Sequence, residues 1–202
     1  MIRAFIGRNV LRLFGWKAEG WKDLPSKCII IGHPHTSNWD FFIFLFARWA
    51  MRLKIHFVGK HTLFKPPLGW LMKAIGGVAV NRSGGRNSVS AIAEVFDHHE
   101  NLALGIAPSG SRSYNTHWRS GFYHIAKTAE VPVVLGYVDY AEKMVGISQF
   151  SVELTGDVSK DMDKIRAFYR DKKGRYPEKQ NPMLLRAETE ESEPTKPAGS
   201  EG

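Results

Sequence analysis

The chain has 202 residues, which is enough for one domain of ordinary size. Its composition, 43% hydrophobic and 24% charged, excludes a wholly disordered protein and a collagen. A single cysteine, Cys28, excludes an intrachain disulfide framework. The formal net charge of +8 indicates an anionic partner, which is a nucleic acid, an anionic lipid or a phosphorylated substrate.

The N-terminal residues 1–14 have the periodicity of an amphipathic helix. Phe5 and Leu13 fall on one side of the expected helix, and Arg8 and Arg12 fall on the other. This pattern suits a helix that lies in the interface of an anionic membrane, because the stripe is rich in Phe and the polar face is purely cationic. The alternative is a surface helix packed on the core. No stretch reaches the roughly 18 apolar residues of a membrane-spanning helix, so we expect any membrane contact to be peripheral.

The following residues alternate between strand and helix patterns. Short apolar runs rich in β-branched residues predict strands at 27–31, 55–58, 78–80, 102–107, 132–138 and 150–154. Helical patterns lie at 38–52, 66–74, 87–98, 121–130 and 161–172, the last with a candidate cap at Ser159. Strands separated by helices predict a single α/β domain whose mixed, largely parallel sheet is flanked by helices.

The C-terminal residues 187–202 differ in composition from the rest. They contain five Glu and one Lys, and no large apolar residue. Such a segment buries too little surface to offset its ordering entropy, so we predict a disordered acidic tail. Without it, residues 1–186 carry 27 Lys and Arg against 15 Asp and Glu, a net charge of +12.

The segment GHPHTSNWD, residues 32–40, follows the first predicted strand. Ligands of parallel α/β sheets bind at the carboxyl ends of the strands. Ser37 and Asp40 have the spacing of a capping box, which gives Asp40 a purely structural interpretation. In the functional interpretation, Asp40 orients the imidazole of His35, and the other ring nitrogen accepts a proton as a general base.

Four sequence blocks carry a resemblance to a known family. The pattern from His35 to Asp40, H-x-x-x-x-D, resembles the first motif of the lysophospholipid (glycerolipid) acyltransferase family. Residues 59–82 resemble its second block, 107–113 (APSGSRS) its third, and 131–137 (VPVVLGY) its fourth. The chain is identified as a member of this family because the four blocks occur in the expected order.

The resemblance implies an acyltransferase domain over residues 15–186. Such an enzyme moves a fatty acyl group from a thioester, acyl-CoA or acyl-carrier protein, to the hydroxyl of a lysophospholipid-type acceptor. By this resemblance, His35 is the general base and Asp40 its orienting partner, and no cofactor is needed beyond the thioester co-substrate. The implied location is cytoplasmic, peripheral to the inner face of a membrane.

The second and third blocks imply the substrate-binding residues, which are Lys60, Arg82, Ser109, Gly110, Ser111 and Arg112. Arginine suits a phosphate because its planar guanidinium donates two parallel hydrogen bonds. The third block departs from the usual Pro-Glu-Gly-Thr-Arg, since Ser109 replaces the Glu and Ser111 the Thr. The loss of the carboxylate at Ser109 indicates either a different acceptor or a catalytically impaired protein that binds membrane lipid.

Other site classes fit the sequence less well. A binuclear metal pattern would need Asp and His where the chain has Ser37 and Asn38, so no metal site is expected. Ser109 and Ser111 lack the G-x-S-x-G elbow of serine hydrolases. A basic nucleic-acid-binding domain is the third alternative, but the basic residues are scattered and form no known recognition motif, so we expect no nucleic acid partner.

Overall fold

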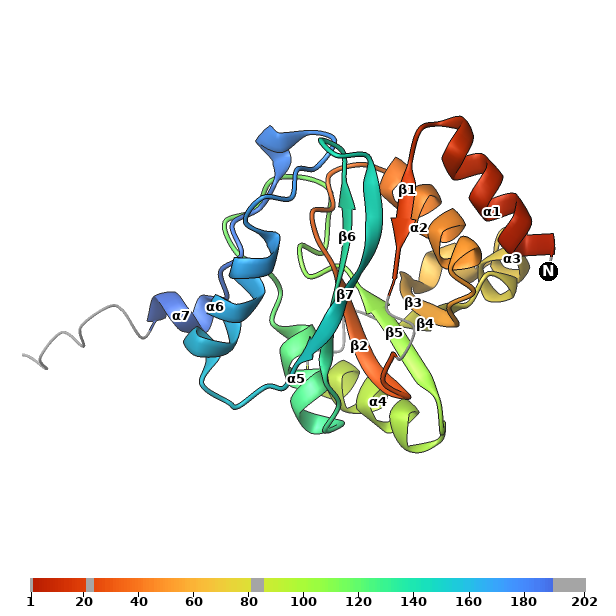
Figure 1. The fold of residues 1–202 in the computed structure, drawn as a ribbon. Helices are drawn as coiled ribbons and strands as arrows, with labels where there is room; N and C mark the ends of the chain where they lie inside the picture. Colours follow the sequence, from red (N-terminus) through yellow and green to blue (C-terminus); the bar gives the residue numbers. More distant parts are fainter. Residues whose placement is uncertain (1, 21–23, 81–85, 191–202) are drawn as a thin grey trace, which may run out of the picture.

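The computed structural model describes residues 2–20, 24–80 and 86–190 (Figure 1). Within them, one sheet has the strand order β1-β7-β6-β2-β5-β3-β4. Neighbouring strands are parallel except β6 and β7, which are antiparallel. This is the mixed, largely parallel sheet that the sequence predicts. The strands are β1 (Lys17–Glu19), β2 (Lys27–Gly32), β3 (Ile55–Lys60), β4 (Gly77–Val80), β5 (Leu102–Ile106), β6 (Val133–Asp139) and β7 (Met144–Val152).

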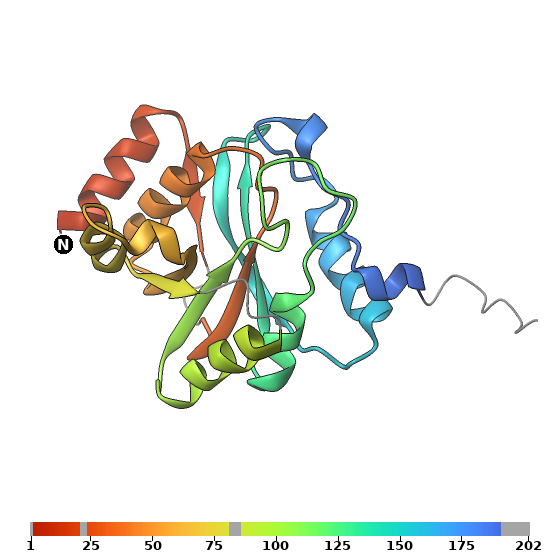
Figure 2. The ribbon, with the colours of Figure 1, turned by 180° about the vertical axis from the view of Figure 1, so that it is seen from behind.

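Helices cover both faces of the sheet (Figure 1 and Figure 2). Helices α1 and α2 lie on one face, and α4, α5 and α6 lie on the other, which gives three layers. The helices are α1 (Ile2–Leu13), α2 (Trp39–Ala50), α3 (Gly69–Ala74), α4 (Arg86–Asp97), α5 (Gly121–Thr128), α6 (Val158–Tyr169) and α7 (Arg186–Glu190), with 3-10 helices η1 (His61–Phe64) and η2 (Pro177–Lys179).

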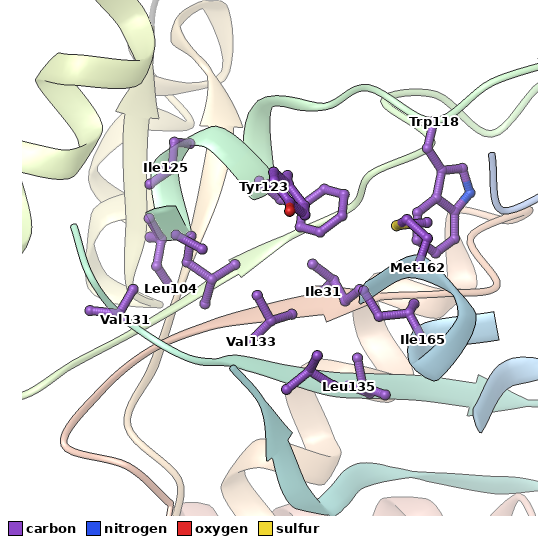
Figure 3. Close-up of a cluster of buried hydrophobic side chains, with 14 of the residues drawn as sticks. Ile31, Leu104, Trp118, Tyr123, Ile125, Val131, Val133, Leu135, Met162 and Ile165 are labelled. Carbon is purple, nitrogen blue, oxygen red and sulfur yellow. The ribbon is translucent and has the colours of Figure 1, made fainter. Parts of the chain in front are cut away.

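The larger part of the core lies between the sheet and α4, α5 and α6 (Figure 3). There, Ile31 of β2 and Val133 and Leu135 of β6 share one cluster with Ile125 of α5 and Ile165 of α6. Because side chains alternate along a strand, β2 also contributes to a second cluster on its α2 face. Burial on both faces explains why β2 and β6 read as unbroken apolar runs.

Helix α1 is present, but the side that it buries consists of two small residues and one leucine, while most of its large apolar residues stay exposed. Ala4, Gly7 and Leu11 are buried, and a Cβ at Gly7 would collide with the backbone of α2, so the small residue permits close packing of the two helices. Phe5 and Leu13, on the predicted apolar face, are 65% and 79% exposed. The apolar face of α1 is therefore not part of the core.

Two strands differ from the prediction. The sequence does not predict β1, and β7 begins at Met144 rather than at residue 150. The two differences are linked, because β1 pairs with the first residues of β7, Lys17 opposite Met144. A three-residue edge strand is specified by this long-range pairing and leaves no periodicity in its own sequence.

The last two helices also correct the sequence prediction. Helix α6 is capped by Asp157, whose carboxylate accepts a hydrogen bond from the backbone N–H of Lys160 at 3.1 Å, and not by Ser159. Residues 187–190 are helical although the predicted disordered tail begins at 187. Glu188 explains the order there, because its carboxylate pairs with Arg166 at 2.6 Å. Residues 191–202 of the predicted tail lie outside the described residues.

Candidate active site

The first motif lies in the loop that joins the end of β2 to the start of α2. In this loop His35 faces Asp40, with His35 Nδ1 3.1 Å from Asp40 Oδ2. The two residues are five positions apart in the sequence, and the contact forms because His35 precedes α2 while Asp40 lies in its first turn. The structure therefore brings together the two residues that the sequence predicts as the catalytic pair.

Asp40 is buried and saturated with donors. Its Oδ2 accepts the backbone N–H groups of Thr36 at 2.9 Å and Ser37 at 3.0 Å, and its Oδ1 accepts the hydroxyl of Tyr140 at 2.8 Å. Ser37 Oγ accepts the N–H of Trp39 at 3.2 Å. Asp40 thus closes the start of α2, as the capping interpretation expects, and orients the imidazole with the same carboxylate.

The arrangement of His35 suits proton transfer. When Nδ1–H donates to Asp40, the imidazole lone pair lies on Nε2, for which the described part of the chain provides no hydrogen-bond partner. The His35 side chain is 23% exposed, so Nε2 is accessible from outside while the other nitrogen is held by a buried carboxylate. This is the geometry of a general base oriented by an acid.

Two residues near the pair have no signal in the local sequence. Burial and the hydrogen bond to Asp40 raise the pKa of Tyr140, so its hydroxyl stays a donor over the physiological pH range. The guanidinium of Arg175 lies 5.9 Å from the ring centre of Trp39, on the first turn of α2. The Arg175 loop is tied to the first motif, because the N–H of Tyr176 donates to the Thr36 hydroxyl at 3.2 Å.

The third motif forms a tight loop after β5. Ser109 is 5% exposed, and its Oγ has no hydrogen-bond partner among the described residues. Gly110 has φ +69°, and a Cβ there would meet the side chain of Arg119. The N–H of Arg119 donates to the carbonyl of Pro108 at 2.8 Å, so Arg119 packs against the loop with both its backbone and its side chain.

The other third-motif residues are more open. Ser111 Oγ accepts from the Asn115 amide at 2.9 Å, which fixes the outer part of the loop. Arg112 is exposed. An exposed arginine next to an ordered loop is available to a ligand from solvent, as the resemblance implies.

The strand order explains how the motifs meet. Strands β2, β5 and β3 are adjacent and parallel, so their carboxyl ends lie along one edge of the sheet. His35 follows β2, the Ser109 loop follows β5, and Lys60 ends β3. Arg82, which follows β4, lies outside the described residues. The predicted site residues that the structure describes thus occupy a single edge, on three neighbouring strands.

Metal and thiol chemistry find no support in the described residues. No group of three His, Cys, Asp or Glu side chains in them is arranged to hold a metal ion. His33 is buried against the rings of Trp118 and Tyr169, and burial together with the charge of His35 lowers the pKa of His33 to about 3. Burial raises the pKa of the Cys28 thiol to about 12, so this cysteine is not a nucleophile.

The fold is α/β, and the candidate His–Asp pair lies at the carboxyl edge of its largely parallel sheet. The chain matches the Acyltransferase family over residues 17–135, more than half of its length, and it belongs to this family. The family and the fold class predicted from the sequence are therefore confirmed, and the protein is an acyltransferase.

A solved structure has the same fold. The 1-acyl-sn-glycerophosphate (LPA) acyltransferase PlsC from Thermotoga maritima matches with a TM-score of 0.51 and 14% sequence identity, covering 81% of this chain and 74% of that one. Comparison with curated protein sequences gives no match. In the described part of the chain, no helix combines the length and apolar character that crossing a bilayer requires.

Proposed function

We propose that this acyltransferase moves a fatty acyl group from a thioester to the hydroxyl of a lysophospholipid-type acceptor, with His35 as the general base. The observation that carries the proposal is the contact of 3.1 Å between His35 and the buried carboxylate of Asp40, at the sheet edge where the family motifs converge. The thioester is acyl-CoA or acyl-carrier protein, and neither a metal nor a further cofactor takes part.

The reaction follows from the two nitrogens of His35. Nε2 accepts the proton of the acceptor hydroxyl as its oxygen attacks the thioester carbonyl carbon, and Asp40 stabilises the imidazolium that forms. The C–S bond then breaks, and the leaving thiolate takes the proton back from Nε2. The acyl group passes directly between the substrates, so no covalent acyl-enzyme is needed.

Arginine and lysine side chains bind the anionic part of the acceptor. We assign this role to Arg112, Lys60 and Arg82, by their match to the third and second blocks. The exposure of Arg112 beside the ordered loop of Ser109 and Gly110 supports its part. Cationic groups that hold the acceptor would also favour the negative charge that develops on the thioester oxygen.

The apolar face of α1 supports a location at the membrane surface. The exposed large apolar side chains of the described residues come largely from α1, α2, α3 and the residues flanking them, and they include Ile2, Phe5, Leu13 and Trp70. Such a face beside exposed arginines fits a helix lying in an anionic interface, where a lysolipid acceptor would also reside. We place the protein on the cytoplasmic side of that membrane.

The test is the substitution His35→Ala. We expect turnover of an acyl thioester with a panel of lysolipids to fall at least about 10³-fold, because the general base is removed. The thermal unfolding midpoint should stay close to that of the parent. His98→Ala, at an exposed histidine after α4, is the control and should keep parental turnover. Turnover of the His35 variant within about tenfold of the parent would refute the role of His35.

A second candidate, a lipid-binding protein of the same fold with impaired catalysis, rests on Ser109. This serine stands where the family usually has Glu, and it is buried without a hydrogen-bond partner among the described residues. The same assay separates the candidates. Product from any acceptor that disappears in the His35 variant supports the enzyme, whereas vesicle binding without product from the whole panel supports the second candidate.

A further inference from the structure

A second cationic site lies away from the His–Asp pair. A pocket of about 520 Å³ is lined by the start of α1, the end of α2, the start of β3 and the end of α3. Its lining contains the cationic residues Arg3, Arg48, Arg52, Lys54 and Lys73. Among the described residues that line it there is no Asp or Glu. So dense a group of cations without a carboxylate repels itself and favours an anion.

Arg48 is the buried member of this group. Arg48 is only 8% exposed, and its Nη1 donates a hydrogen bond to the carbonyl of Ile55. Nε is buried and has no hydrogen-bond partner among the described residues. Burial, followed by the charge of Arg3, lowers the pKa of Arg48. Among the described residues, no carboxylate forms an ion pair with Arg48. A buried guanidinium that lacks a counter-ion is costly, and a bound anion would remove that cost.

The pocket is not an extension of the active site. It includes Ile55, the first residue of β3, whereas His35 follows the last residue of β2. Because β3 and β2 are both parallel to β5, these positions lie at opposite edges of the sheet. The residues that bind an acceptor at the carboxyl edge therefore do not account for the cations at the amino edge.

We propose that this pocket binds a phosphate group, supplied either by a lipid headgroup or by a free phosphate compound. Guanidinium groups match phosphate oxygens with paired hydrogen bonds, and several cations around one cavity suit a doubly charged oxyanion better than a single carboxylate. The volume exceeds that of one phosphate ion, so the site also accommodates the group to which the phosphate is bonded. Arg3 lies in the first turn of α1, so the pocket is next to the exposed apolar side chains of Ile2 and Phe5.

The test compares two double variants of the full chain that lose the same charge. Arg3→Gln with Lys73→Gln removes two cations of the pocket. Lys164→Gln with Arg170→Gln removes two exposed cations of α6 and its C-terminal cap that do not line the pocket and lie away from α1. Calorimetric titration with inorganic phosphate at fixed ionic strength measures the Kd. We expect the Kd to rise at least ~10-fold in the pocket variant, which is the effect of losing one charge-assisted hydrogen bond. In the control, the Kd should stay near the parent value.

A second measurement distinguishes the two sources of phosphate. Both variants are sedimented with phosphatidylcholine vesicles that do or do not contain phosphatidic acid. A larger loss for the pocket variant on the anionic vesicles assigns the site to a lipid headgroup. Equal vesicle binding, with phosphate binding lost only in the pocket variant, assigns it to a free phosphate compound. The proposal is overturned if the two variants behave alike in both measurements.

Discussion

The carboxylate of Asp40 holds a loop and a side chain at the same time. Two of its donors are the backbone N–H groups of Thr36 and Ser37, so it fixes the path of the chain from β2 into α2. The other two are His35, at Oδ2, and Tyr140, at Oδ1. A carboxylate fixed by several hydrogen bonds cannot rotate away, and the imidazole that it holds keeps one tautomer and one orientation.

Tyr140→Phe tests this positioning role. The change removes one donor to Asp40 but keeps the ring that packs against Trp16 at 4.9 Å. Because a hydrogen bond to a charged group contributes about 1.5–3 kcal/mol, we expect the free energy of unfolding to fall by about that amount. If His35 is the general base that we propose, turnover should fall ~10-fold with a smaller change in KM, since the oriented imidazole would act in the transition state.

The matched control is Tyr114→Phe. Tyr114 is 57% exposed, so loss of its hydroxyl should change neither the unfolding free energy nor turnover. Chemical denaturation and steady-state kinetics measure both quantities. If Tyr140→Phe leaves turnover at the parental level while destabilising the fold, the hydrogen bond to Asp40 is structural only.

His33 gives the fold a dependence on pH. The unfolded chain protonates this histidine near pH 6.5, whereas burial and the charge of His35 keep it neutral in the folded chain until about pH 3. The unfolded state therefore binds the extra proton between these values, and stability falls as pH decreases below 6.5. His33→Gln, which cannot titrate, should lose about 2 kcal/mol less than the parent between pH 7 and pH 5.

Urea denaturation at a series of pH values measures this difference. His124→Gln, at an exposed histidine of α5, is the control and should retain the parental pH dependence. Parallel curves for the parent and the His33 variant would show that His33 titrates normally in the folded protein.

At the scale of the element, α1 illustrates how a helix can be predicted while its buried face is not. Periodicity predicts the helix and the apolar stripe of Phe5 and Leu13 correctly. It cannot predict that Gly7 would bring α1 so close to α2 that Ala4 and Leu11 form the contact. Close packing of the two helices depends on the size of the side chain at position 7, whereas the hydrophobic pattern reports only which residues are apolar.

The exposed stripe of α1 predicts membrane binding that is separable from folding. Phe5→Ser combined with Leu13→Ser should leave the thermal unfolding midpoint nearly unchanged, because both side chains are largely exposed. Each large apolar side chain buried in a membrane contributes about 1.5–3 kcal/mol, so partition onto anionic vesicles should fall at least ~10-fold. Vesicle sedimentation measures it. Phe150→Ser, an exposed position of β7, is the control, and an equal loss there would contradict the role of α1.

Local patterns predict most elements because strands and helices differ in period, but the contacts between elements are long-range. The contact between His35 and Asp40 is predictable because the two residues are only five positions apart and follow the end of the same strand. Tyr140 is a hundred residues away from Asp40 and reaches it because β6 lies beside β2. Strand order follows from the packing of the whole sheet, so neither Tyr140 nor Arg175 could be assigned from the sequence.

At the scale of the whole molecule, charge is divided between two parts of the chain. Residues 1–186 carry a net charge of +12, and the remaining residues to the C-terminus carry −4. We propose two uses for the positive charge. Arg112 follows β5 at the sheet edge that holds His35, and another group of cations lines the pocket formed by α1, α2, α3 and β3. The acidic residues therefore weaken every long-range attraction of this domain to an anionic surface.

Truncation after Glu190 tests this balance. It removes three Glu and one Lys, and the net charge rises from +8 to +10. We expect binding to anionic vesicles at low salt to strengthen ~3-fold or more, since each charge near such a surface contributes up to about 1 kcal/mol. The gain should disappear at about 1 M salt, where the screening length is about 3 Å. Replacing Glu191 and Glu193 by Gln at full length should reproduce the gain if charge is its cause. A gain that appears only on truncation, or that persists at high salt, would instead indicate that the segment obstructs the binding face.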